Sequence, residues 1–138
     1  MLPFEWLTVM ARLPPLRTML WFDSLAGLIA GVAMLALAGV LAAPMGVARE
    51  LLLTTAAVNV GYGLCSLTLA RRAAPPRRYV RALIVANLAW AVVCAVLVVR
   101  IAGPGRWLGA TFYLLEGLFV GVLGLVEARV ARRAFAPR

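Results

Sequence analysis

The sequence predicts an all-α integral membrane protein, a four-helix bundle with both termini in the cytoplasm. The composition is 64% hydrophobic and 14% charged over 138 residues, whereas soluble domains are about 45–50% apolar and about 25% charged. Four apolar runs are each long enough to cross a bilayer. Arginines at the ends of these runs indicate the orientation. Together these observations predict a single transmembrane domain over residues 1–138.

The first expected span covers about residues 18–43 and carries Asp23 near its start. Its apolar stretch exceeds the 7–15 residues of a signal-peptide core, so we expect a retained helix rather than a cleaved leader. The preceding segment 3–12 holds apolar and aromatic side chains ahead of Pro14 and Pro15. It is interpreted either as a short interfacial helix on the inner leaflet or as a frayed tail.

Three further spans are expected at about residues 51–70, 82–102 and 107–128. A spanning helix needs about 20 predominantly apolar residues, and each run meets this requirement. The last run is interrupted by an acidic residue, Glu116. The segments between the spans are short, so the chain is expected to form two helical hairpins with no domain outside the membrane.

Arginine placement predicts the topology. The two termini and segment 71–81 are expected on one side, which holds eleven arginines against three on the other. By the positive-inside rule, the richer side is cytoplasmic. The formal net charge is +9, yet a nucleic-acid partner is not expected, because the arginines flank apolar runs. We expect a multi-pass protein of the bacterial inner membrane that contacts membrane lipids.

Each expected span contains one strongly polar residue: Asp23, Asn59, Asn87 or Glu116. A rise of about 1.5 Å per residue places Asp23 and Asn87 about 8 Å from the cytoplasmic end and the other two about 15 Å from it. Helical phase puts Tyr62 on the same stripe as Asn59. These five residues are the predicted polar intramembrane site. Alternatively, the amides only tie helices together, and Asp23 reaches the interface or pairs with an arginine.

Glu116 is the most informative of these residues, because a carboxylate at the centre of a bilayer costs several kcal/mol. No arginine is expected at its depth. Two interpretations stay open. Glu116 is either a neutral acid that hydrogen-bonds to Asn59 as a structural strut, or a carboxylate that loads and unloads a proton or a cation.

Small residues recur at helical spacing in two of the spans. Gly27 and Gly31 form one pair, and Gly117, Gly121 and Gly124 form a longer seam. Such seams allow membrane helices to approach closely, so we expect helix packing there. Because four helices enclose little space, we also expect a homo-oligomer or a partner membrane protein, and the longer seam is a candidate for joining two subunits.

Catalytic, metal and cofactor sites are not expected. The chain has no His and two Cys, Cys65 and Cys94, which lack the paired spacing of a zinc site. No nucleophile–base pair and no cofactor motif stands out in the sequence. We therefore expect that the protein is not an enzyme.

Three stretches carry a resemblance: "WFDSLAGLIAGV", "VANLAWAVV" and "LLEGLFVGVLG". They are similar to stretches of small bacterial four-helix integral membrane proteins that have no assigned activity. The resemblance implies the fold and no particular chemistry. Two functions remain: a transporter- or channel-like protein with a site centred on Glu116, and a non-transporting accessory or scaffold subunit of a larger membrane complex.

Overall fold

The computed structural model describes residues 14–136, and the regular structure in this range is entirely helical. Each of the four helices is long and apolar enough to cross a membrane. This finding confirms the prediction of four apolar helices in an all-α chain. The interfacial helix expected over residues 3–12 lies outside the described residues. The four helices are α2 (Leu16–Met45), α3 (Arg49–Ala70), α4 (Arg77–Ile101) and α5 (Trp107–Ala134).

The helices extend beyond the apolar runs that predicted them. α4 begins at Arg77 rather than near residue 82, and α5 continues to Ala134 rather than ending near 128. A span estimated from apolar length stops at the first charged residue, whereas a helix continues while its backbone hydrogen bonds are satisfied. The last turn of α5 carries Arg132 and Arg133, whose positive charge is favourable at a helix C-terminus.

α2 ends in a glycine turn directly after a proline. Pro44 lies in the last turn of the helix, and Gly46 follows with a φ of 64°. This left-handed conformation is easiest for glycine. The backbone N–H groups of Gly46 and Val47 donate to the carbonyls of Ala43 and Ala42 respectively. The turn provides hydrogen-bond donors for carbonyl groups at the end of α2, and it reverses the chain directly into α3.

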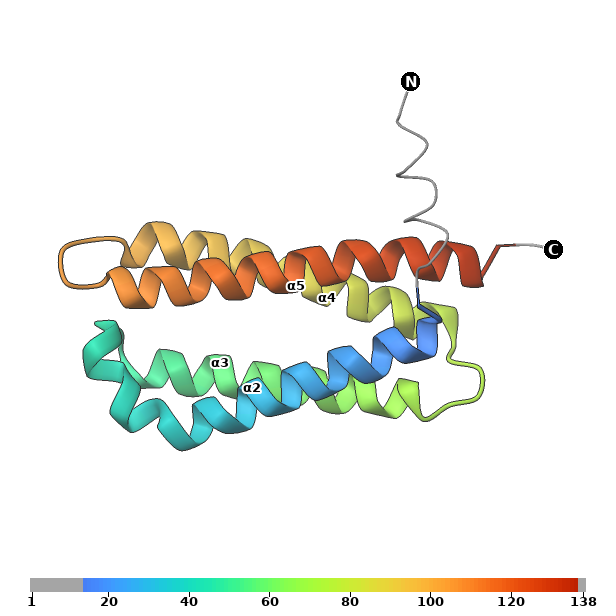
Figure 1. The fold of residues 1–138 in the computed structure, drawn as a ribbon, viewed down its shortest axis with the longest axis horizontal. Helices are drawn as coiled ribbons and strands as arrows, with labels where there is room; N and C mark the ends of the chain where they lie inside the picture. The colour runs from blue at the N-terminus through green and yellow to red at the C-terminus, as the bar shows by residue number, and fades with distance from the viewer. Residues whose placement is uncertain (1–13, 137–138) are drawn as a thin grey trace, which may run out of the picture.

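The four helices pair as two hairpins that lie side by side (Figure 1). α2 packs mainly against α3, and α4 packs mainly against α5. Contacts between the two hairpins are few and join α2 to α5 and α3 to α4. The start of α2, the end of α5 and the connection between α3 and α4 lie at the same end of the molecule. Each hairpin is therefore a tightly packed unit, and the interface between hairpins is looser.

Glycines allow the close approach inside the first hairpin. A Cβ added at Gly27 would lie 3.1 Å from the carbonyl oxygen of Asn59. A Cβ added at Gly31 would lie 2.8 Å from the backbone nitrogen of Val60. Gly39, further along α2, has no atom within 4 Å of such a Cβ. Gly31 therefore permits a backbone contact between α2 and α3 that any side chain would push apart.

The glycine seam of α5 packs inside the second hairpin. A Cβ added at Gly117 would lie 2.8 Å from the Cβ of Cys94, and one at Gly124 would lie 3.1 Å from the Cβ of Asn87. Gly121 faces α4 as well. The expectation that this seam joins two subunits is therefore corrected, because α4 of the same chain occupies it.

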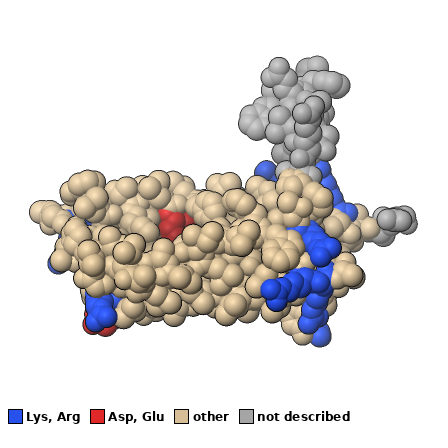
Figure 2. Space-filling model, turned by 60° about the horizontal axis from the view of Figure 1, so that its bottom comes forward, with Lys and Arg blue, Asp and Glu red and all other residues tan. Residues whose placement is uncertain are grey.

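Basic side chains gather at one end of an otherwise apolar body (Figure 2). This basic end contains the connection between α3 and α4, and the opposite end carries Arg49, Arg100 and Arg106. Between the two ends, large apolar side chains of all four helices are exposed. Such a belt suits a chain surrounded by hydrocarbon. The arginines described at the basic end are Arg17, Arg71, Arg72, Arg77, Arg78, Arg81, Arg129, Arg132 and Arg133.

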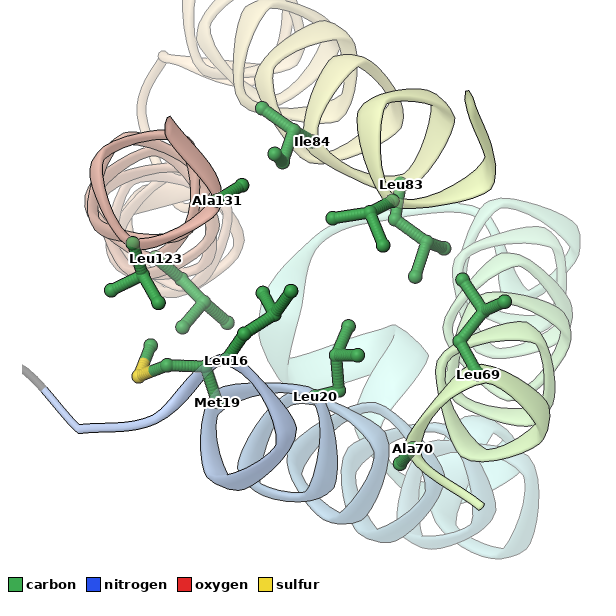
Figure 3. Close-up of a cluster of buried hydrophobic side chains, with 11 residues drawn as sticks. Leu16, Met19, Leu20, Leu69, Ala70, Leu83, Ile84, Leu123 and Ala131 are labelled. Carbon is green, nitrogen blue, oxygen red and sulfur yellow. The ribbon is translucent and has the colours of Figure 1, made fainter. Parts of the chain in front are cut away.

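An apolar cluster fills the space between all four helices near the basic end (Figure 3). Leu20 of α2, Leu69 of α3, Leu83 of α4 and Leu123 of α5 are buried in it. Their burial holds the two hairpins together at this end. We call this cluster the basic-end plug, and its other members are Leu16, Met19, Ala70, Val80, Ile84, Val130 and Ala131.

The opposite end is closed by a second set of contacts between the hairpins. Gly109 near the start of α5 lies against Met45, the last residue of α2, and against Val47 in the turn that follows. Val47 also packs against the buried cluster that contains Ile101 and Tyr113. We call these five residues the far-end plug. The two hairpins therefore meet near both ends of the bundle.

The α2–α3 contact makes a stability prediction. Gly31→Ala should lower the free energy of unfolding by about 1–3 kcal/mol, the usual cost of overpacking, because the new Cβ meets the α3 backbone. Gly39→Ala is the matched control on the same helix and should be neutral or slightly stabilising, since alanine is the better helix former. Unfolding in detergent, followed by circular dichroism, measures both. Equal stabilities would contradict this interface.

Candidate functional site

A cavity of about 630 Å³ lies between the two hairpins, and all four helices line it. Its volume is within the range of about 300–1,000 Å³ that is typical of small-molecule sites. The finding corrects the expectation that four helices enclose little space, because the loose interface between hairpins leaves room within one chain. Most of the lining is apolar. The polar and amphipathic side chains that line it are Asp23, Asn59, Tyr62, Asn87, Trp90 and Glu116.

Glu116 of α5 lies near the middle of the cavity wall and is held by two other helices. Its Oε1 accepts a hydrogen bond of 2.9 Å from Nδ2 of Asn59 on α3 and one of 2.8 Å from Nε1 of Trp90 on α4. Its Oε2 is buried and has no hydrogen-bond partner among residues 14–136. One carboxyl oxygen is thus held by two hydrogen bonds, and the other is buried without one.

A second polar group lies closer to the basic end. Asp23 and Glu127 are 3% and 1% exposed, and the two carboxyl groups interact with each other. Nδ2 of Asn87 donates a hydrogen bond of 3.2 Å to Oε2 of Glu127. Asp23 also interacts with Tyr62 and Asn87. Within the described chain, Oδ2 of Asp23, Oε1 of Glu127 and the Tyr62 hydroxyl have no hydrogen-bond partner.

Two further polar contacts stabilise the helices outside the cavity. The hydroxyl groups of Thr55 and Tyr113 are 2.9 Å apart and join α3 to α5. The Ser66 hydroxyl donates to the carbonyl of Leu20, 2.9 Å away, and joins α3 to α2. Thr55, Tyr113 and Ser66 are fully buried. Their groups are satisfied by each other or by the backbone, so we assign them structural roles.

The structure places all five predicted site residues in the cavity wall. Asn59 and Glu116 are bonded at one level, and Asp23 lies beside Asn87 and Tyr62 at the other. The burial of Asp23 leaves no support for the alternative in which it reaches out to the membrane interface.

Two members of the site were missing from the sequence-based prediction. Trp90 was not included in the predicted site, and it donates to Glu116. Glu127 falls near the end of the expected span 107–128 but was not counted among the polar residues of the site. Helical phase contains a signal for both. Trp90 follows Asn87 by about one turn, and Glu127 follows Glu116 by about three turns, so each lies on the face of a recognised polar residue.

Several residues that line the cavity are also exposed on its flanks, between the two ends of the bundle. The basic-end plug and the far-end plug lie beyond it at the two ends. On the flank formed by α2 and α5, the lining residues Leu115 and Phe119 are 61% and 47% exposed. On the flank formed by α3 and α4, Val58 and Val93 are 39% and 42% exposed. Figure 2 shows acidic atoms at the surface between the two ends of the apolar body. In a bilayer, both flanks face hydrocarbon.

The arrangement is suited to binding. It offers carboxylate acceptors, amide groups, a phenol and an indole, set in an apolar wall that no arginine of the described chain lines. Across residues 14–136, no group of three or more His, Cys, Asp or Glu side chains could hold a metal ion. A wall of apolar and aromatic side chains with a few convergent polar groups is typical of small-molecule sites.

The hydrogen bonds of Glu116 make a second prediction. Glu116→Gln keeps an acceptor for Asn59 and Trp90, so its free energy of unfolding should stay close to that of the parent. Glu116→Leu leaves both donors unpaired and should cost about 1–3 kcal/mol. Unfolding in detergent, followed by circular dichroism, compares the two variants. A Leu variant as stable as the Gln variant would show that these bonds do not hold the helices.

No protein-family model, no curated protein and no solved structure matches this chain. The resemblance of its three stretches to small bacterial four-helix proteins therefore stays a prediction. Function must follow from the chain's own residues. The features that bear on it are the cavity between the hairpins, the partly bonded carboxyl group of Glu116 and the plugs at the two ends.

Proposed function

We propose that the chain is a small carrier of the bacterial inner membrane that binds its substrate in the cavity centred on Glu116. The observation that carries this proposal is the free Oε2 of Glu116 beside a cavity of about 630 Å³. A carboxylate at the middle of a bilayer costs several kcal/mol, and an unfilled cavity loses packing contacts. A ligand that fills the cavity and contacts Glu116 offsets both costs.

The closed ends favour a carrier over an open channel. Both plugs are apolar contacts between the hairpins, so a water-filled path along the helix axes is absent from the described chain in this state. Each hairpin is internally tight, while the contacts between hairpins are few. Rocking of one hairpin against the other would open either plug in turn, as in carriers that alternate access around a central site. Because the cavity forms within one chain, this mechanism needs no second subunit.

The alternative is a non-transporting accessory or scaffold subunit of a larger membrane complex. It is favoured by the bonds from Asn59 and Trp90 to Glu116, which tie α3, α4 and α5 together as a strut would. In that case the exposed flanks pack against helices of a partner. A scaffold keeps its cavity closed to water, whereas a carrier opens it.

The proposed orientation puts both termini in the cytoplasm, as the arginine-rich end requires. A phosphatase reporter that is active only outside the cytoplasm should be inactive when fused after Arg138. The same reporter inserted in segment 103–106 should be active. The opposite pattern would reverse the orientation, so that the basic-end plug would lie on the outer side of the membrane.

Alternating access predicts that water reaches the cavity in at least one state. In a Cys65→Ser, Cys94→Ala background, Ala26→Cys places a thiol in the cavity wall at a half-buried position. This thiol should react with a membrane-impermeant maleimide in lipid vesicles. Gly61→Cys is the control, since a Cβ there has no atom within 4 Å and the helix is surrounded by lipid; it should not react. If Ala26→Cys is also unreactive from both sides, the carrier proposal fails and the scaffold is favoured.

A further inference from the structure

The cavity also indicates the class of its ligand, an inference that rests on the carrier proposal and extends it. We infer that the ligand is a lipophilic organic cation, a compact positive group on an apolar body, which enters from the hydrocarbon core of the bilayer. Three features of the wall carry this inference: the sign of its charged groups, its aromatic side chains and its exposed flanks.

The charged groups of the cavity favour a positive ligand. Glu116 and Asp23 both line it, and each has a buried carboxyl oxygen without a hydrogen-bond partner in the described chain. No arginine is among the residues that line the cavity. Charges interact strongly in apolar surroundings, so these acidic groups attract a cation and repel an anion such as a fatty acid.

Aromatic side chains surround the same space. Trp90, Tyr62, Phe112 and Phe119 line the cavity. The faces of such rings attract ammonium, guanidinium and quaternary onium groups. The indole of Trp90 donates to Glu116 across 2.8 Å, so a ring and a carboxyl group are held at one point of the wall. This combination suits a bulky cation that needs a counter-charge and a polarisable surface.

An inorganic cation fits this wall less well. Ca²⁺ takes six to eight oxygen ligands, and Mg²⁺ takes a near-octahedral set. Around Glu116 the neighbours Asn59 and Trp90 present N–H donors to the carboxyl group instead of oxygen atoms. The remaining lining is largely apolar. An organic cation needs only one or two counter-charges there and buries its body against the apolar wall.

The exposed flanks indicate the route of access. The plugs lie at both ends, while the lining residues Leu115 and Val93 are exposed on opposite flanks. Only a molecule dissolved in the hydrocarbon core can enter this state without moving the hairpins. The ligand therefore needs an apolar body both to enter from the hydrocarbon core and to pack against the cavity wall.

Two ions of the same shape and opposite charge test the inference. Tetraphenylphosphonium and tetraphenylborate are added separately to the full chain in nanodiscs of zwitterionic lipid, and empty nanodiscs measure partition into lipid. Equilibrium dialysis should show saturable binding of tetraphenylphosphonium above the lipid background, with one site per chain. Tetraphenylborate should show only the background. Equal saturable binding of both ions, or of neither, would overturn the assignment.

Variants locate the binding. Glu116→Gln keeps the hydrogen bonds of the wall and removes the charge, so the Kd for tetraphenylphosphonium should rise at least tenfold. Glu50→Gln, at an exposed acidic residue in the first turn of α3, is the matched control and should leave Kd unchanged. Trp90→Phe keeps a ring and should weaken binding less than Glu116→Gln. An unchanged Kd in Glu116→Gln would place the cation elsewhere and contradict the inference.

The binding test and the thiol-labelling test can each contradict one proposal without contradicting the other. A labelled Ala26→Cys without tetraphenylphosphonium binding keeps the carrier and rejects the cation. Binding that depends on Glu116, combined with an unreactive Ala26→Cys, keeps the cation site and rejects the carrier. The sign of the ligand charge and the alternation of access are thus decided by different measurements.

Discussion

The apolar outer surface of the four helices is the constraint on which the rest of this structure depends. A polar side chain in hydrocarbon must find its partner within the protein. Asp23, Asn59, Asn87, Glu116 and Glu127 all turn toward the space between the hairpins. The hydrogen bond from Asn59 to Glu116 joins one hairpin to the other at midspan. The position of the candidate site is therefore a consequence of where polar groups are tolerated.

The packing inside the hairpins differs in kind from the packing between them. Gly31 brings α2 against the α3 backbone, and Gly117 brings α5 against α4, so each hairpin is tight over its length. Between the hairpins, contact is concentrated in the two plugs and a few polar bonds. The cavity lies between the hairpins, where a movement of one hairpin against the other would break the fewest contacts. In the proposed carrier, binding and movement use this same interface.

Much of this fold could be predicted from the sequence, because apolar length and helical phase are local properties. Depth along each helix was enough to put Asn59 level with Glu116. The role of the Gly117 seam could not be predicted, because small residues show that a close contact exists without showing which helix makes it. The cavity and the bond from Trp90 depend on how far apart the hairpins settle. Glu127 was missed because only one strongly polar residue was taken from each span, although this residue lies near the end of the expected span 107–128.

The two plugs also affect whether protons can reach Glu116. A carboxyl group inside a membrane span can act as a proton relay. Leucines such as Leu20 and Leu83 on one side, with Ile101 and Tyr113 on the other, separate Glu116 from both aqueous phases. In the proposed carrier, apolar layers of this kind would prevent protons from leaking across the membrane through this acid.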